Sequence, residues 1–205
     1  MNGPMFAGTC SSPAFAGLFR GSVESTINSY ISPVKKAAGK HQRAALIAKR
    51  IPKDRQRPIK AEDILNERGM YSPLMQVYLA YLVSNDVRTW YEEAPLLDVA
   101  KRTINDPLAV HHIFPRELLR HQIEPDKINC MANYAILSQA DNATIGKEHP
   151  QVIYDGLSAK AKDYADQQLF FILAEPRDWI AAYEAFLKKR AEALAARLTS
   201  FVKLG

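Results

Sequence analysis

Apolar residues recur at helical spacing through the last part of the chain. From Ile180 onward they return every three or four positions, at Tyr183, Leu187, Ala191, Leu194, Leu198 and Phe201. A helix turns once every 3.6 residues, so this spacing places them on one stripe of a long helix. The basic residues lie largely off the stripe, at Lys188, Lys189, Arg190 and Arg197. We expect a packing face rather than a coiled-coil seam, because one helix of this length contains few heptads.

Three earlier segments also predict helices. In "YSPLMQVYLAYLVSND" Ser72 is a suitable N-cap, Pro73 occupies the first helical position, and the apolar body that follows predicts a buried helix. "AEDILNERG" predicts a short helix with Gly69 as its C-cap. "YADQQLFFILA" predicts another buried helix.

Residues 108–150 differ in their pattern of apolar residues from the helical segments on either side. "LAVHHIF" and "NYAILS" are short and rich in residues that favour strands, and "QADNATIGKEH" predicts a short helix with Ser138 as its N-cap. We therefore predict a mainly α fold, a helical domain at 66–205 with an embedded strand–strand–helix (ββα) unit at about 108–150. Residues 1–65 are expected to form an N-terminal segment with a basic helix and a linker.

Composition narrows the class of protein. The chain has 205 residues, of which 47% are hydrophobic and 24% charged, as in ordinary globular proteins. No apolar run is long enough to span a bilayer, and the start lacks the features of a signal peptide. Cys10 and Cys130 are the only cysteines, which excludes a disulfide scaffold and a four-cysteine zinc site. These features favour a cytoplasmic protein without membrane association, in which Cys130 is a small buried residue.

Positive charge is concentrated in one segment. Residues 35–60 contain ten Lys and Arg residues and one acid, which leaves 17 basic against 21 acidic residues elsewhere. Such a segment suggests a polyanion as partner, although a solvated helix face followed by a linker would have the same composition.

Two of the five histidines are adjacent, at His111 and His112 on the first expected strand. Neighbouring strand residues point to opposite sides, so the pair cannot act as twin metal ligands. One imidazole can face a metal ion while the other faces a water molecule, which is the division that hydrolysis of a phosphodiester by one metal requires. Asn142, on the expected helix, can offer a carbonyl oxygen to the same ion, and Asn133, at the start of the second strand, can tie the intervening loop to the first.

The stretch "VHHIFPRELL…INCMANYAILSQADNATIGKEHP" resembles the HNH nuclease motif in its ββα-metal form. It is most similar to the C-terminal nuclease region of GmrSD-type restriction proteins, and flanking helical segments extend the resemblance to residues 18–203. The resemblance implies roles for six residues: metal ligands His111 (Asp in many relatives) and Asn142, general base His112, loop-organising Asn133, phosphate contact Lys147 and loop-fixing Pro115.

The resemblance also implies partners and cofactors. It implies a DNA endonuclease that restricts foreign or modified DNA with a divalent ion, Mg²⁺ or Mn²⁺, with Ni²⁺ or Zn²⁺ also admitted by a histidine ligand. The Asp-Gly-Gln-Gln-Arg motif of the nucleotide-binding domain in those restriction proteins has no counterpart here. The resemblance therefore implies the nuclease half alone, either as a separate polypeptide whose partner is a nucleotide-binding subunit or as a fragment of a larger protein.

Several alternatives stay open at this point. The chain could be a catalytically inactive module that binds nucleic acid or protein, or its substrate could be RNA. His149 could be a third ligand, a phosphate contact or a surface residue. The sequence leaves the oligomeric state undetermined.

Overall fold

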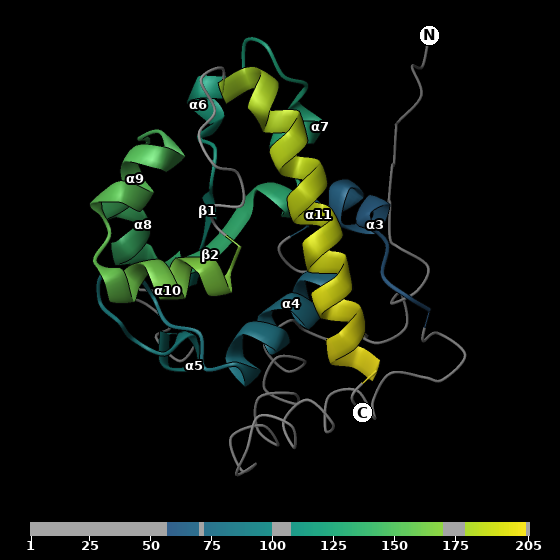
Figure 1. Cartoon of the computed structure of the whole chain (residues 1–205), viewed down its shortest axis with the longest axis horizontal. Helices are drawn as coiled ribbons and strands as arrows, with labels where there is room; N and C mark the ends of the chain where they lie inside the picture. The colour runs from purple at the N-terminus through teal and green to yellow at the C-terminus, as the bar shows by residue number, and fades with distance from the viewer. Residues whose placement is uncertain (1–56, 70–71, 100–107, 170–178, 204–205) are drawn as a thin grey trace, which may run out of the picture.

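The computed structural model describes residues 57–69, 72–99, 108–169 and 179–203. This part of the chain is mostly helical and contains a two-stranded antiparallel sheet, so the prediction of a mainly α fold is confirmed (Figure 1). The basic helix expected before residue 51 lies outside the described residues.

The described elements follow in chain order. They are α3 (Ala61–Asn66), α4 (Pro73–Ser84), α5 (Leu96–Val99), β1 (Leu108–His112), α6 (Arg116–Leu119), α7 (Pro125–Ile128), the 3-10 turn η2 (Met131–Asn133), β2 (Tyr134–Ser138), α8 (Gln139–Ile145), α9 (Pro150–Gly156), α10 (Ala159–Gln167) and α11 (Trp179–Lys203).

Two of the expected N-caps are confirmed and one expected C-cap is wrong. The Ser72 hydroxyl accepts the N–H of Met75 at 3.1 Å, and the Ser138 hydroxyl accepts the N–H of Asp141 at 3.0 Å. α3 ends earlier than expected, with Glu67 as its C-cap in an extended conformation. Because the chain leaves the helix at Glu67, no left-handed residue is needed, and the N–H of Gly69 bonds to the Glu67 carboxylate at 2.9 Å.

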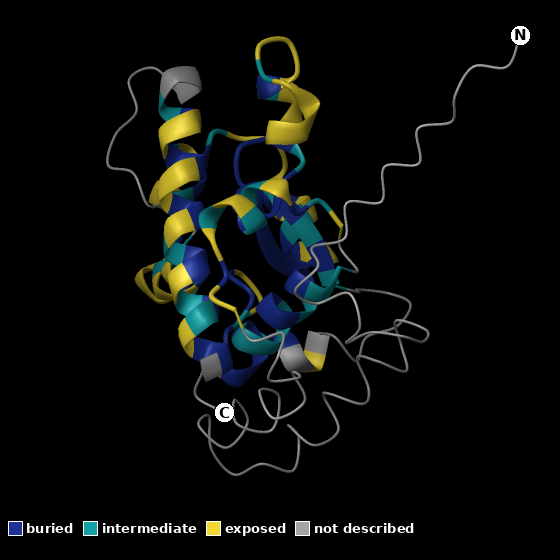
Figure 2. Cartoon of the chain, turned by 90° about the vertical axis from the view of Figure 1, so that its right-hand side faces the viewer, coloured by how far each residue is buried: buried dark blue, intermediate teal, exposed yellow. Residues whose placement is uncertain are grey.

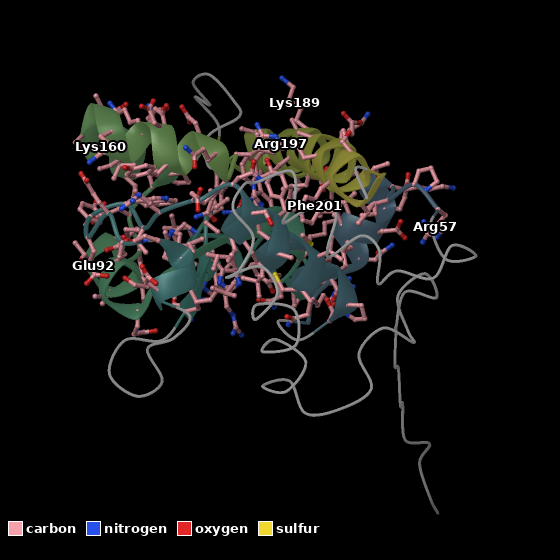
Figure 3. The ribbon with its side chains drawn as sticks, turned by 90° about the horizontal axis from the view of Figure 1, so that it is seen from below. Arg57, Glu92, Lys160, Lys189, Arg197 and Phe201 are labelled. Carbon is pink, nitrogen blue, oxygen red and sulfur yellow. The ribbon has the colours of Figure 1, made fainter. Side chains whose placement is uncertain are left out.

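The apolar stripe of the last helix is confirmed as a packing face. Its described members from Tyr183 to Phe201 are all buried along α11, and exposed positions alternate with them on the outer side (Figure 2). α11 packs against α3, α4 and η2. Arg190 departs from the expectation, because it is fully buried while its neighbour Lys189 points away from the body (Figure 3).

The Arg190 guanidinium lies among neutral oxygen atoms from three other parts of the fold. Six of them lie 2.6–3.4 Å from its nitrogens, so that its five N–H groups are all used and one is shared: the carbonyls of Met131, Ala132, Tyr134, Gln168 and Leu169, and the hydroxyl of Tyr78. Burial lowers the pKa of Arg190 from its ordinary value, but arginine stays protonated in proteins. Position 190 is seven residues after Tyr183 and four before Leu194, so it lies at the edge of the buried stripe, and these oxygen atoms allow the interior to tolerate the charge.

β1 and β2 pair in antiparallel register, with Leu108 opposite Ser138 and His112 opposite Tyr134. α8 follows β2 directly and packs against both strands. The other edge of β2 is closed by a side chain, since Gln168 accepts the N–H of Ile136 at 2.8 Å and donates to its carbonyl at 2.7 Å. Every residue of β2 is buried.

The helix expected over "YADQQLFFILA" is shorter than predicted. α10 ends at Gln167, Leu169 has a positive φ of 55°, and residues 170–174 lie outside the described part. The chain leaves the helix where Gln168 turns inward to the edge of β2, and this strand contact is not visible in a helical pattern.

Residues 57–69 are in contact with the helical body. α3 packs against α11 and η2, and the N–H of Ile59 bonds to the Thr199 hydroxyl at 2.9 Å. The boundary expected at residue 65 thus falls within α3. Among the helices described, none is long and apolar enough to cross a membrane.

We predict that replacing Arg190 with Ala destabilises the protein by at least about 3 kcal/mol, because it leaves a cavity and removes donors from several buried carbonyls. Arg190→Lys should recover part of this loss, since an ammonium group has three donors. Urea unfolding measures both. Lys188→Ala, an exposed neighbour on α11, should stay within about 0.5 kcal/mol of wild type. If Lys188→Ala and Arg190→Ala are equally stable, the buried hydrogen bonds of Arg190 do not stabilise the fold.

Candidate metal and catalytic site

The two adjacent histidines lie on opposite faces of β1, as the strand period predicts. His111 is buried, with 3% of its surface exposed, and faces α8. Its Nδ1 lies 3.0 Å from Oδ1 of Asn142, thirty-one residues further along the chain. The structure therefore brings together the two residues predicted as metal ligands.

The environment of His111 keeps the imidazole neutral. Burial lowers its pKa to about 4, and the hydrogen bond with Asn142 offsets this only in part. The Trp90 ring meets the imidazole edge-on, with 6.2 Å between ring centres, and restricts its position. A neutral imidazole is the form that can bind a metal ion.

The donor pair can be tested against the geometry of a divalent ion. Two ligand atoms at right angles, each about 2.1 Å from one octahedral ion, lie about 3 Å apart. The observed 3.0 Å between Nδ1 and Oδ1 fits this arrangement, provided that the Nδ1 proton moves to Nε2. Among the described residues no group of three His, Cys, Asp or Glu side chains could hold a metal ion. The fit is that of the His111 and Asn142 side chains alone.

Asp141, the residue before Asn142, was not anticipated. Its buried carboxylate accepts three successive backbone N–H groups of the loop that follows α4, those of Trp90, Tyr91 and Glu92, at 2.5–3.3 Å. It thereby holds Trp90 against His111. The spacing of Ser138 and Asp141 is typical of a helix-capping box, so the sequence signal points to a local role and not to this long-range contact.

His112 lies on the more exposed face of β1. Its Nε2 is 3.1 Å from Oδ1 of Asn129, and its ring meets Tyr134 edge-on with 5.1 Å between centres. Burial is the main cause that lowers the pKa of His112, the Asn129 hydrogen bond opposes it, and the charge of Arg116 lowers the pKa further. The imidazole is therefore available as a base at neutral pH. Asn129 was not predicted, because a single asparagine in a loop has no distinctive spacing.

Asn133 ties the loop between the strands to the end of β1. Its amide accepts the N–H of Phe114 at 2.9 Å and donates to the carbonyls of Phe114 and Ile128 at 3.1 and 3.0 Å. Its backbone carbonyl accepts the N–H of Ile113 at 2.9 Å. The expected tie is present, although Asn133 is the last residue of η2 and not part of β2.

The remaining candidates lie at the edges of this region. Lys147 forms an exposed ion pair of 2.9 Å with Glu117 on α6, a contact that solvent screens strongly. Pro115 is the N-cap of α6, three residues after the end of β1. His149 is the N-cap of α9, where its Nδ1 accepts the N–H of Gln151 at 3.1 Å.

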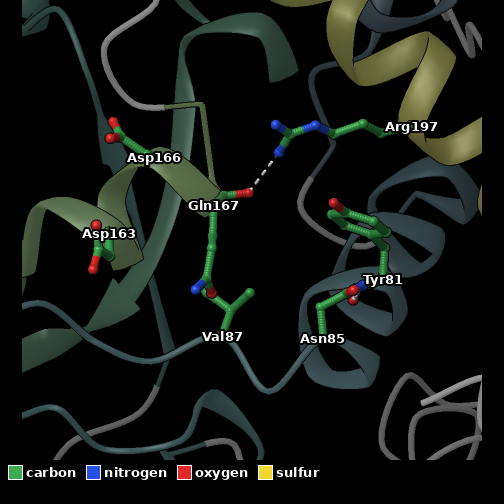
Figure 4. A pocket seen from close by; sticks show the side chains of 7 residues that line it. All are labelled: Tyr81, Asn85, Val87, Asp163, Asp166, Gln167 and Arg197. Atoms are coloured by element: carbon green, nitrogen blue, oxygen red, sulfur yellow. Dashed lines mark hydrogen bonds between the residues drawn. The ribbon is translucent and has the colours of Figure 1, made fainter. Parts of the chain in front are cut away.

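A pocket of about 470 Å³ lies elsewhere, between α4, α10 and α11 (Figure 4). It is lined by Tyr81, Asn85, Val87, Asp163, Asp166, Gln167 and Arg197. Arg197 bonds to the Gln167 carbonyl at 2.9 Å. None of its lining residues belongs to the candidate site at β1.

The chain was compared with models of known protein families, with characterised proteins and with solved structures, and none of the three comparisons finds a match.

We predict a loss of stability in acid that depends on His111. Its pKa is about 4 in the folded chain and about 6.5 when unfolded, so unfolding takes up a proton between these values. This contribution is complete above pH 6.5 and is lost as the pH falls toward 4, by at most about 3 kcal/mol. Urea unfolding at several pH values, with a chelator present, measures the free energy of unfolding. This free energy should depend less on pH in His111→Gln than in the wild type.

His121→Gln is the matched control, because His121 is exposed. Its free energy of unfolding should change with pH as that of the wild type does. If His111→Gln has the same pH dependence of the free energy of unfolding as the wild type, the His111 imidazole is not buried in its neutral form.

Proposed function

We propose that this protein is a metal-dependent endonuclease of the HNH type that hydrolyses DNA phosphodiester bonds. The observation that supports the proposal best is the arrangement at the end of β1. One imidazole meets a carboxamide oxygen at 3.0 Å on one face, and the next imidazole lies on the other face. The two strands are followed by a helix, and this order also supports the proposal of an HNH-type site.

Each residue would have a distinct part in hydrolysis. His111 and Asn142 would hold a divalent ion, which when bound supplies positive charge to the scissile phosphate and the leaving oxygen. His112 would take a proton from the attacking water as its oxygen forms a bond to phosphorus. The bond to the leaving sugar oxygen breaks, that oxygen keeps the electron pair and takes a proton from solvent, and His112 returns its proton to solvent.

The donor set bears on the choice of ion. A neutral imidazole and a neutral carboxamide contribute no negative charge to the site. Mg²⁺ prefers oxygen ligands, whereas Mn²⁺ accepts nitrogen more readily, so we expect Mn²⁺ to support cleavage at least as well as Mg²⁺. Ni²⁺ and Zn²⁺ are compatible with the same donors.

DNA is the proposed substrate, in the restriction of foreign or modified DNA in the cytoplasm with a separate nucleotide-binding subunit. The basic composition of residues 35–60 supports contact with a polyanion backbone. Of these residues the structure describes 57–60, where Arg57 forms a bidentate pair with Asp63 at 2.7 Å. Lys147 is proposed as a phosphate contact, because its exposed ion pair with Glu117 can be exchanged for a phosphate at small cost.

One observation favours a second candidate, an inactive module that binds nucleic acid or protein. His111 and Asn142 already satisfy one another by a direct hydrogen bond in a buried position. Such a pair can stabilise the join between β1 and α8 without an ion. The two candidates differ in whether a metal ion binds and whether DNA is cut.

We predict that the wild-type protein nicks supercoiled plasmid DNA with Mn²⁺ or Mg²⁺, and that His112→Ala reduces the rate by about 100-fold to 10,000-fold because the base is lost. Gel analysis of nicked and linear products measures this. His121→Ala should cut at the wild-type rate. A comparison of DNA and RNA duplexes of the same sequence shows which of the two is the substrate. A His112→Ala protein that folds and cuts at the wild-type rate would contradict the assignment of the base.

Metal binding is predicted separately from cleavage. Mn²⁺ at about 100 times its Kd should add about 2.7 kcal/mol of stability and raise Tm by about 5–10 °C. His111→Ala and Asn142→Ala should lose this rise, whereas His112→Ala should keep it. Scanning calorimetry with and without a chelator measures the effect. A rise in Tm without cleavage of any nucleic acid would favour the inactive module, and an equal rise in every variant would place the ion elsewhere.

A further inference from the structure

The imidazole of His112 has a specific side-chain partner. Its Nε2 lies 3.1 Å from Oδ1 of Asn129, seventeen residues along the chain. A carboxamide oxygen only accepts hydrogen bonds, so Nε2 must carry the proton for this contact to be favourable. In a neutral imidazole the lone pair is then on Nδ1.

Asn129 is itself held in place by the turn that contains it. It is the C-cap of α7, where its N–H bonds to the Pro125 carbonyl at 2.9 Å. The carbonyl of the preceding Ile128 accepts from the Asn133 amide at 3.0 Å. Because the backbone on this side is fixed, the Asn129 side chain presents its oxygen from a defined position.

A second contact limits rotation of the His112 ring. Tyr134 is the residue paired with His112 across the sheet, and the two rings meet edge-on at an interplanar angle of 87°. A flip of the imidazole about its χ2 angle would put Cε1 in the place of Nε2 and break the contact with Asn129. The ring is therefore held both at Nε2 and on its flank.

We propose that Asn129 is a positioning residue that fixes His112 in the tautomer protonated at Nε2, so that Nδ1 is the atom that accepts the proton of the attacking water. This rests on the proposed nuclease function for the water, but the choice of tautomer is a property of the protein alone. The histidine in the Ser-His-Asp triad shows the value of such a partner, since a wrong tautomer there costs about 10⁴-fold in rate.

Three variants test the proposal. Asn129→Ala removes the acceptor and should lower kcat for DNA nicking by about 10-fold to 100-fold, with KM changed less than about twofold. Asn129→Asp keeps an acceptor oxygen at the same place and should restore most of kcat at pH 8. Asn85→Ala is the matched control, because Asn85 is likewise the C-cap of a helix, α4, and should cut like the wild type.

The tautomer is measured directly by ¹⁵N NMR of protein with labelled histidine, at pH 8 and without metal. We expect the His112 proton on Nε2 in the wild type and in Asn85→Ala, and a mixture of tautomers in Asn129→Ala. A proton on Nδ1 in the wild type, or equal cleavage by the alanine variants at 85 and 129, overturns the proposal. If the wild type cuts no nucleic acid, the nuclease function fails, and the NMR result still decides whether Asn129 fixes the tautomer.

Discussion

The buried guanidinium of Arg190 is the contact on which most of the described fold depends. From α11 it reaches the carbonyls of η2, the first carbonyl of β2 and the carbonyls that follow α10. Each of these backbone groups would otherwise lie in the interior without this donor, and a charged donor makes stronger hydrogen bonds than a neutral one. One side chain thus joins the last helix to the turn that precedes β2.

That turn carries the candidate site on its other side. Asn133, the last residue of η2, bonds to Phe114 at the end of β1 and to Ile128 at the end of α7. Phe114 follows His112 by two residues, and Ile128 precedes its partner Asn129. Arg190 and Asn133 therefore help to place both members of the His112–Asn129 pair.

The sequence predicts those parts of the structure that depend on local periodicity and on single-residue chemistry. The stripe of α11, the caps Ser72 and Ser138 and the two strands are of this kind, because each depends on neighbours within a few residues. Arg190, Gln168 and Asp141 are of the other kind. Each is polar and buried, and each is satisfied by backbone groups at least twenty residues away, which no spacing along the chain encodes.

The candidate site divides in the same way. The alternation of a strand was enough to separate His111 from His112, and Asn142 could be selected because its interval matched a known motif. Asn129 could not be selected, because its position is set by the turn between α7 and η2 and not by its distance from His112.

The partner oxygens identified for the two imidazoles belong to asparagines and not to acids, and this has an electrostatic consequence. A carboxylate partner would favour the protonated imidazolium, whereas a carboxamide holds the ring without adding charge. Burial lowers the pKa of both histidines, so both stay neutral at physiological pH. Under the proposed function, a metal ion between His111 and Asn142 would keep its full positive charge, and the phosphate of the substrate would supply the balancing negative charge. Metal and nucleic acid would then each raise the affinity for the other, because binding free energies are coupled reciprocally.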